Sequence, residues 1–122
     1  MSLRILVAED ELVTACDLCD TFEEAGYEIE GPHAGVSTAM LACQREKPDL
    51  AFLDIELADG LAFELAQKLI DDDVPVILHT EAAAAVDIAA RFPRATTLAK
   101  PCPPAELLGV VSRVIGPCCT PG

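Results

Sequence analysis

Short apolar runs alternate with helix-length amphipathic segments along the chain, and this alternation restricts the fold more than any other feature of the sequence. Three runs are almost continuously apolar, at residues 3–8, 50–53 and 74–78. Such runs are typical of strands buried on both faces of a parallel sheet. Two weaker runs, at 27–30 and 95–99, mix polar with apolar residues. They are expected at the edges of the same sheet.

The segments between and after these runs carry apolar residues at helical spacing. Five helices are expected, at residues 11–25, 36–47, 61–70, 81–92 and 104–115. Strict alternation of five strands with five helices predicts an α/β fold, a doubly wound parallel sheet with right-handed crossovers and helices on both faces. Turn-forming residues such as Gly26, Gly31-Pro32 and Pro101 are expected to separate the elements.

Length and charge narrow the function classes. The chain has 122 residues, of which 52% are hydrophobic, so one domain over residues 1–116 with a short tail at 117–122 is expected. Eight Lys and Arg against 21 Asp and Glu give a net charge of −13, which disfavours direct binding to nucleic acid or to membrane surfaces. It favours a metal cation or a basic partner protein. The first apolar run is too short for a signal peptide or a membrane span, so a cytoplasmic protein is expected.

Six cysteines require an explanation in a chain without a secretory signal. Cys16 and Cys19 form a C-x-x-C, the spacing of many zinc and redox sites. Leu12, Cys16, Cys19 and Phe22 also recur at helical spacing, which predicts that both thiols lie on the buried face of one helix. We therefore expect reduced core cysteines rather than a metal or redox site.

Reactive side chains follow four of the five predicted strands. Glu9-Asp10 follow the first strand, Asp54 ends the third, Thr80 follows the fourth and Lys100 the fifth. Ligands of open α/β sheets bind beyond the carboxyl ends of the strands, so these side chains are expected to converge. Clustered carboxylates need a cation, and Mg²⁺ is the ion that such oxygen ligands hold beside a phosphoryl group. A hydroxyl, an ammonium and a carboxylate nucleophile complete a phosphoryl-transfer pocket.

Four motifs carry a resemblance to a known family. They are ILVAEDE at 5–11, PDLAFLD at 48–54, PVILHT at 75–80 and AKP at 99–101. In this order and at strand ends, they resemble the receiver domain of bacterial two-component response regulators, in particular the stand-alone, chemotaxis-regulator-like members. The resemblance covers roughly residues 3 to 116. It implies a flavodoxin-like sheet with strand order 2-1-3-4-5.

The resemblance also implies roles for particular residues. It implies a switching protein rather than a turnover enzyme, phosphorylated by a histidine kinase or a phosphotransfer protein. The implied roles are Asp54 as phosphoacceptor, Asp10 as direct Mg²⁺ ligand, Glu9 as a ligand through water, the backbone carbonyl of Glu56 as a further ligand, Thr80 as switch hydroxyl and Lys100 as phosphate-binding lysine. A cis peptide bond between Lys100 and Pro101 is implied as well.

The sequence departs from the family at three places. Thr97 replaces the usual aromatic residue, Glu81 replaces a small residue after the switch hydroxyl, and the loop from Asp54 to Gly60 is short. Because Thr97 is small and stiff, we expect phosphorylation to act through residues 81–85 and the alanine-rich helix after them. Residues 82–92 are then the expected surface for a downstream protein or a second copy of the chain.

Two other functions fit parts of this pattern. A degenerate receiver would bind partners without being phosphorylated. A Mg²⁺-dependent phosphohydrolase of the haloacid-dehalogenase type would use Asp54 as nucleophile, but Glu56 stands where those enzymes place a second aspartate. Of the remaining polar groups, residues 71–73 are expected to form a solvated acidic turn. His79 is expected to pack near the pocket rather than carry phosphate.

Overall fold

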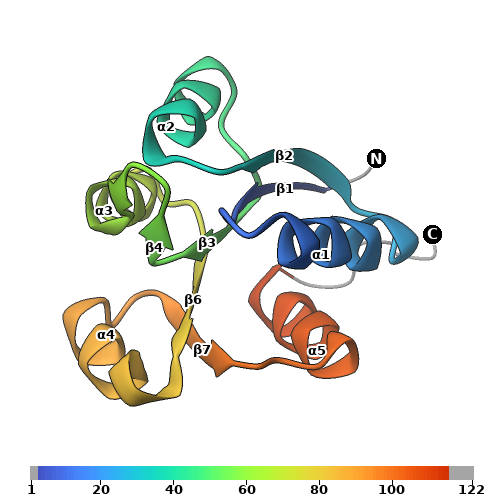
Figure 1. Ribbon diagram of the computed structural model, residues 1–122. Helices are drawn as coiled ribbons and strands as arrows, with labels where there is room; N and C mark the ends of the chain where they lie inside the picture. The colour runs from blue at the N-terminus through green and yellow to red at the C-terminus, as the bar shows by residue number, and fades with distance from the viewer. Residues whose placement is uncertain (1–2, 116–122) are drawn as a thin grey trace.

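A computed structural model describes residues 3–115, and a five-stranded parallel sheet forms its centre (Figure 1). The sheet order is β2-β1-β3-β6-β7, which confirms the expected 2-1-3-4-5 pattern. Its strands are β1 (Arg4–Ala8), β2 (Glu28–His33), β3 (Leu50–Asp54), β6 (Val76–Glu81) and β7 (Thr96–Lys100). A short antiparallel hairpin of two-residue strands, β4 (Glu56–Leu57) and β5 (Gly60–Leu61), was not expected. The predicted tail at 117–122 lies outside the described residues.

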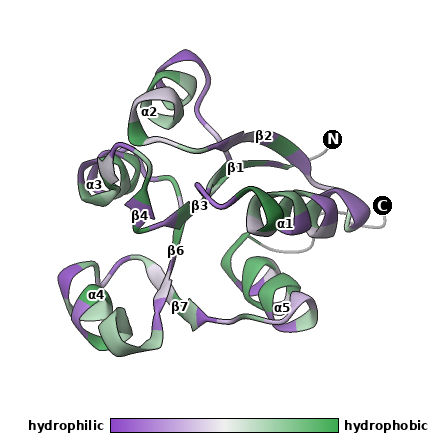
Figure 2. Cartoon of the chain, viewed as in Figure 1, coloured by the Kyte–Doolittle hydropathy of each residue, from purple (hydrophilic) through white to green (hydrophobic). Residues whose placement is uncertain are grey.

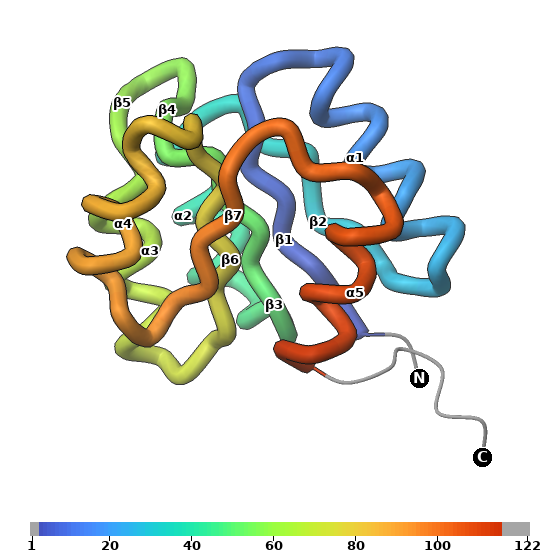
Figure 3. The backbone as a smooth tube through the Cα atoms, turned by 90° about the horizontal axis from the view of Figure 1, so that it is seen from below, coloured from blue at the N-terminus to red at the C-terminus, as the bar shows by residue number. Residues whose placement is uncertain are grey.

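Helices cover both faces of the sheet, as expected. They are α1 (Leu12–Glu24), α2 (Val36–Arg45), α3 (Phe63–Asp71), α4 (Ala85–Arg91) and α5 (Pro104–Ile115), with a short 3₁₀ turn, η1 (Ala82–Ala84), before α4. Helices α1 and α5 lie on one face, and α2, α3 and α4 lie on the other (Figures 1 and 3). Within the described part of the chain, no helix is both long and apolar enough to cross a bilayer.

Each face of the sheet has its own hydrophobic core. Ile5 and Val7 of β1 pack toward α1 and α5, whereas Leu6 and Ala8 pack toward α2 and α3. All five residues of β3 are buried. Figure 2 shows the hydrophobic residues running through β1 and along α5. The two half-polar strands, β2 and β7, occupy the edges as predicted, because an edge strand is exposed along one side.

The prediction of which residues of α1 face the core is wrong in part. Leu12 is 73% exposed and Cys16 is exposed, whereas Cys19 and Phe22 are buried as expected. The buried stripe also contains Ala15 and Leu18. Two overlapping stripes satisfy the same helical spacing, and the packing against β1 and α5 selects the one without Leu12. In a similar way, Leu61 belongs to β5 and is exposed rather than starting α3.

Gly31-Pro32 does not end β2, contrary to the prediction from the sequence. The strand continues to His33, and its pairing with β1 shifts between Leu6 and Ala8 so that Ala8 lies opposite His33. Gly31 has φ +119°, and a Cβ there would lie 2.8 Å from the carbonyl oxygen of Val7. Only glycine fits this approach, and the proline is tolerated because β2 is an edge strand.

The β4–β5 hairpin caps helix α2 from a distance in sequence. Gly35, at the N-terminus of α2, offers no side-chain cap. Asp59 supplies one: its carboxylate accepts hydrogen bonds from the backbone N–H of Val36 (2.6 Å) and Ser37 (3.1 Å) and from the Ser37 hydroxyl (2.9 Å). These bonds satisfy N–H groups that have no partner inside the helix and hold the pKa of Asp59 below its usual value.

Replacing Asp59 by asparagine is expected to lower the urea midpoint of unfolding at about pH 7. The folded-state pKa of Asp59 is depressed, so its stabilisation is present above the unfolded pKa and is lost as the pH falls through the folded pKa. The difference between the wild type and Asp59→Asn should therefore shrink steadily as the pH is lowered toward about 3.

Asp20→Asn is the matched control, because Asp20 is exposed on α1 and its carboxylate makes no hydrogen bond or ion pair within residues 3–115. A pH-independent difference for Asp59→Asn, or an equal loss in the control, would contradict the capping role.

Candidate functional site

The side chains predicted to converge line one pocket of about 330 Å³ at the carboxyl ends of the strands. Parallel pairing brings the ends of β1, β3, β6 and β7 to the same rim. Five residues at or just after the strand ends line this pocket: Glu9, Asp10, Asp54, Thr80 and Lys100. Glu56 of β4 also lines the pocket. That its backbone carbonyl binds the metal ion stays a prediction.

Asp54 and Lys100 form an ion pair across the pocket floor. The Lys100 Nζ donates to Asp54 Oδ2 at 2.9 Å, and Asp54 is 5% exposed. Burial on its own lowers the pKa of Lys100, but the hydrogen bond to Asp54 and the surrounding carboxylates raise it, and the net direction is upward. Lys100 is therefore a fixed positive charge beside one carboxylate oxygen. The Lys100-Pro101 peptide bond is cis, as the family resemblance implied.

Glu9 and Asp10 complete a three-carboxylate cluster with Asp54. One oxygen from each of the three lies within 4.8 Å of the others. Glu9 is 3% exposed, and its Oε1 has no hydrogen-bond partner, while its Oε2 accepts the Glu11 backbone N–H at 3.2 Å. Burial, followed by the close approach of the Asp54 carboxylate, raises the pKa of Glu9 to about 7.

This cluster fits a hard divalent cation. The three donors are all carboxylates, which are ligands that Mg²⁺ prefers, and the unpartnered oxygen of Glu9 points to a missing positive charge. Asp10 is exposed at the pocket mouth, where an ion can keep part of its water shell. No other cluster of this kind occurs in the described part of the chain.

Thr80 also lines the pocket and is buried in β6. Its neighbour Glu81, together with Glu11, Thr14 and Ala84, also lines the pocket, and the sequence prediction did not include these four. The signal that would have found the two glutamates is their position, because both follow directly after a residue already assigned to the site. Thr14 lies one helical turn beyond Glu11, and its hydroxyl donates to Glu11 Oε1 at 2.6 Å.

His79 packs near the pocket, as predicted. It is 5% exposed, and its ring lies 5.2 Å from that of Phe52. Burial, followed by the charge of Lys100, lowers its pKa, so the imidazole is neutral at physiological pH. Cys102, two residues beyond Lys100, packs against the core under α1 and α5.

The other sequence features do not form a site. Cys19 and Cys43 are buried as expected, and burial raises the pKa of Cys19 to about 11. Cys16 is exposed, so the prediction that both thiols of the C-x-x-C are in the core is wrong. Residues 71–73 are exposed at the opposite rim, where Asp73 pairs with Arg94 at 3.3 Å.

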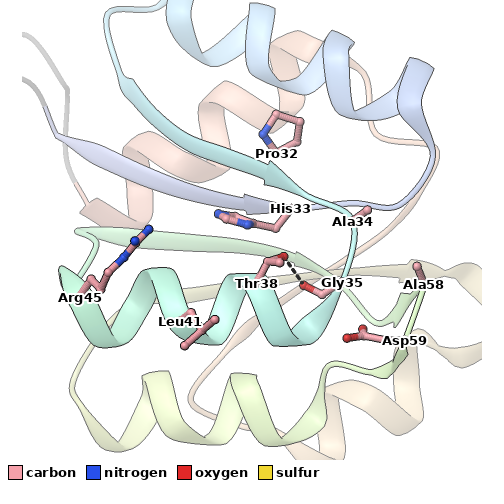
Figure 4. A pocket seen from close by; sticks show the side chains of 9 residues that line it. All are labelled: Pro32, His33, Ala34, Gly35, Thr38, Leu41, Arg45, Ala58 and Asp59. Carbon is pink, nitrogen blue, oxygen red and sulfur yellow. Dashed lines mark hydrogen bonds between the residues drawn. The ribbon is translucent and has the colours of Figure 1, made fainter.

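A larger hollow of about 730 Å³ lies beside α2, away from the strand-end residues (Figure 4). His33, Thr38, Leu41 and Arg45 are among the residues that line it, and Asp59 borders it. None of the predicted site residues reaches this hollow. The smaller pocket at the strand ends is therefore the candidate functional site.

Glu9→Gln is expected to stabilise the metal-free protein at about pH 8 and to have little effect at about pH 4. The folded-state pKa of Glu9 is raised, so stability is lost as the pH rises from the unfolded pKa through about 7. Glutamine avoids this loss, and the gain should be at most about 3 kcal/mol.

Urea unfolding in a chelator at several pH values measures the gain. Glu24→Gln, an exposed charge at the far end of α1, is the control for the loss of one negative charge. A Glu9→Gln effect that does not grow with pH would contradict the raised pKa.

Comparisons with known proteins agree with this geometry. Over 118 residues, the chain is 30% identical to the phyllosphere-induced regulator PhyR of Methylorubrum extorquens, covering 94% of this chain and 44% of PhyR. Over 81 residues, it is 36% identical to the transcriptional regulatory protein PdtaR of Mycobacterium tuberculosis, covering 63% of this chain and 38% of PdtaR. The chain thus spans less than half the length of these two relatives.

A solved structure gives the same fold. The solution NMR structure of the receiver domain of PhyR from Erythrobacter litoralis superimposes with a TM-score of 0.83 at 26% identity, covering 99% of this chain and 95% of that one. The sequence also matches the response regulator receiver domain family over residues 5–112. The chain therefore belongs to the receiver domain family of response regulators in two-component signalling.

Proposed function

We propose that this receiver domain accepts a phosphoryl group on Asp54 from the phosphohistidine of a kinase or phosphotransfer protein, in a Mg²⁺-dependent step, and so changes a protein-binding surface. The observation that carries the proposal is the buried Asp54 carboxylate, held at 2.9 Å by Lys100 and flanked by Glu9 and Asp10. This arrangement combines a nucleophile, a fixed cation and a set of metal-binding oxygens in one pocket.

The chemistry follows from the positions of these groups. An oxygen of Asp54 forms a bond to phosphorus while the P–N bond to the donor imidazole breaks, and the nitrogen keeps the electron pair and is protonated. Lys100 neutralises one phosphoryl oxygen, and the Thr80 hydroxyl donates a hydrogen bond to another. Asp10, Asp54 and the Glu56 carbonyl would hold Mg²⁺, with Glu9 acting through water, and the ion would neutralise charge on the incoming phosphoryl group. The protein acts as a switch rather than as a turnover enzyme.

The alternatives have less support. A degenerate receiver needs no intact pocket, yet Asp54, Thr80 and Lys100 all line it here. A phosphohydrolase of the dehalogenase type is expected to carry a second aspartate two residues after the nucleophile. Glu56 occupies that position and is exposed in the β4–β5 hairpin at the pocket mouth.

Incubation with a small phosphodonor and Mg²⁺ is expected to add one phosphoryl group to the wild type, seen as a single adduct by intact-mass spectrometry. Asp54→Asn should show no adduct, because the amide is not a nucleophile, and a chelator should abolish the adduct in the wild type. Asp20→Asn serves as control, since Asp20 is an exposed aspartate on α1 that does not line the pocket. An adduct that persists in Asp54→Asn would refute the assignment.

The surface at residues 82–92 is proposed to carry the response to a downstream protein or a second copy. Thr80 connects directly through Glu81 to η1 and α4, and Ile88 is the only buried residue of these two elements. Val86 is 79% exposed there. A helix with so few buried contacts rearranges at low free-energy cost. Thr97 is too short to fill the space that a moving Thr80 would leave.

Amide hydrogen exchange with and without beryllofluoride, in Mg²⁺, tests this route. We expect the largest changes in residues 80–92 and little change at Thr97. Thr80→Ala should reduce the change in amide exchange at residues 82–92 and should leave the change near Asp54 as it is in the wild type. A response centred on Thr97, or one confined to the pocket, would contradict the route.

A further inference from the structure

The acceptor pocket carries more negative charge than metal binding requires. Six carboxyl groups and one ammonium line it. Glu9, Asp10 and Asp54 form the inner cluster. Three more carboxylates, which we call the mouth carboxylates, are Glu11, Glu56 and Glu81, and all three are exposed. A divalent cation on the inner cluster would offset that cluster and leave the mouth carboxylates unneutralised.

Glu81 differs from the other two mouth carboxylates by its place beside the cation. The pairing of β6 with β7 sets Glu81 directly opposite Lys100, so the two side chains lie on the same face of the sheet. The Lys100 ammonium is 2.9 Å from Asp54 and forms no ion pair with Glu81. Within residues 3–115, neither Glu56 nor Glu81 has a hydrogen bond or an ion pair to its carboxylate. Glu81 therefore weakens the attraction that Lys100 offers to an approaching anion.

We propose that Glu81 is a specificity-determining residue that disfavours small anionic phosphodonors and favours a donor protein with cationic side chains around its phosphohistidine. This inference rests on the proposed function, because it concerns which donor reaches Asp54. The transferred phosphoryl group is the same for every donor. A charge at the pocket mouth therefore distinguishes donors by the charge that they carry outside this group.

The expected size of the effect follows from Coulomb's law. Across a pocket open to water, one carboxylate changes the rate by roughly twofold for each unit of donor charge at low salt. Removing it should therefore accelerate transfer about twofold from a monoanion and about fourfold from a dianion. A lysine at the same position should produce roughly the square of these factors.

The experiment compares two donors at about pH 7: phosphoramidate, a monoanion, and acetyl phosphate, a dianion. Rates of adduct formation at Asp54 are measured for the wild type, Glu81→Gln and Glu81→Lys at saturating Mg²⁺. We expect both variants to accelerate transfer, with a larger factor for acetyl phosphate, and the difference between donors to disappear in about 1 M salt, where the Debye length is about 3 Å.

Glu24→Gln is the matched control, since it removes the same charge from an exposed site at the far end of α1. Equal acceleration with both donors would show that Glu81 acts by its size or by moving Lys100, and would overturn the inference. No acceleration, or a salt-independent one, would overturn it as well. A wild type that accepts phosphate from neither donor would instead refute the proposed function, and with it this inference.

Discussion

Burial of the central strands on both faces is the constraint on which the rest of this structure depends. β1, β3 and β6 carry apolar side chains toward both helical layers, so polar side chains are excluded from most of their length. Such groups can stand only where the strands end, and parallel pairing brings those ends to one rim. The same constraint that builds the core therefore concentrates carboxylates, a hydroxyl and an ammonium in one pocket.

That concentration has an electrostatic cost in the metal-free protein. Glu9 is removed from water next to Asp54, and its pKa rises to about 7 because the buried site disfavours a second negative charge. Lys100 relieves part of the repulsion through its bond to Asp54. A divalent cation on the three carboxylates would supply the remaining positive charge. The same three carboxylates thus repel one another in the metal-free protein and would attract a cation.

Contacts between distant segments hold the elements in place at both ends of the sheet. Asp59 of the β4–β5 hairpin caps α2, which ties the chain beyond Asp54 to a helix on the same face of the sheet as α3. Arg4, at the start of β1, donates a backbone hydrogen bond to Asp49 and pairs with Glu30 at 2.8 Å. These contacts fix the ends of β1, β2 and β3 relative to one another. By contrast, α4 has one buried residue, Ile88, and so has few contacts with the core.

The sequence by itself determined the fold class, the order of elements and the residues at the strand ends, because two-sided burial leaves a plain apolar pattern and places polar residues just after it. It did not determine which stripe of α1 faces inward, since Leu12 and Cys16 fit the helical spacing as well as Ala15 and Leu18 do. Nor did it reveal that β2 continues through Gly31-Pro32, that Asp59 caps α2, or that Glu81 lies opposite Lys100. Those features depend on contacts between segments far apart in the chain, and local periodicity carries no information about such contacts. Only the tertiary structure decided them, through the packing of α1 and α5 against β1 and through the register of neighbouring strands.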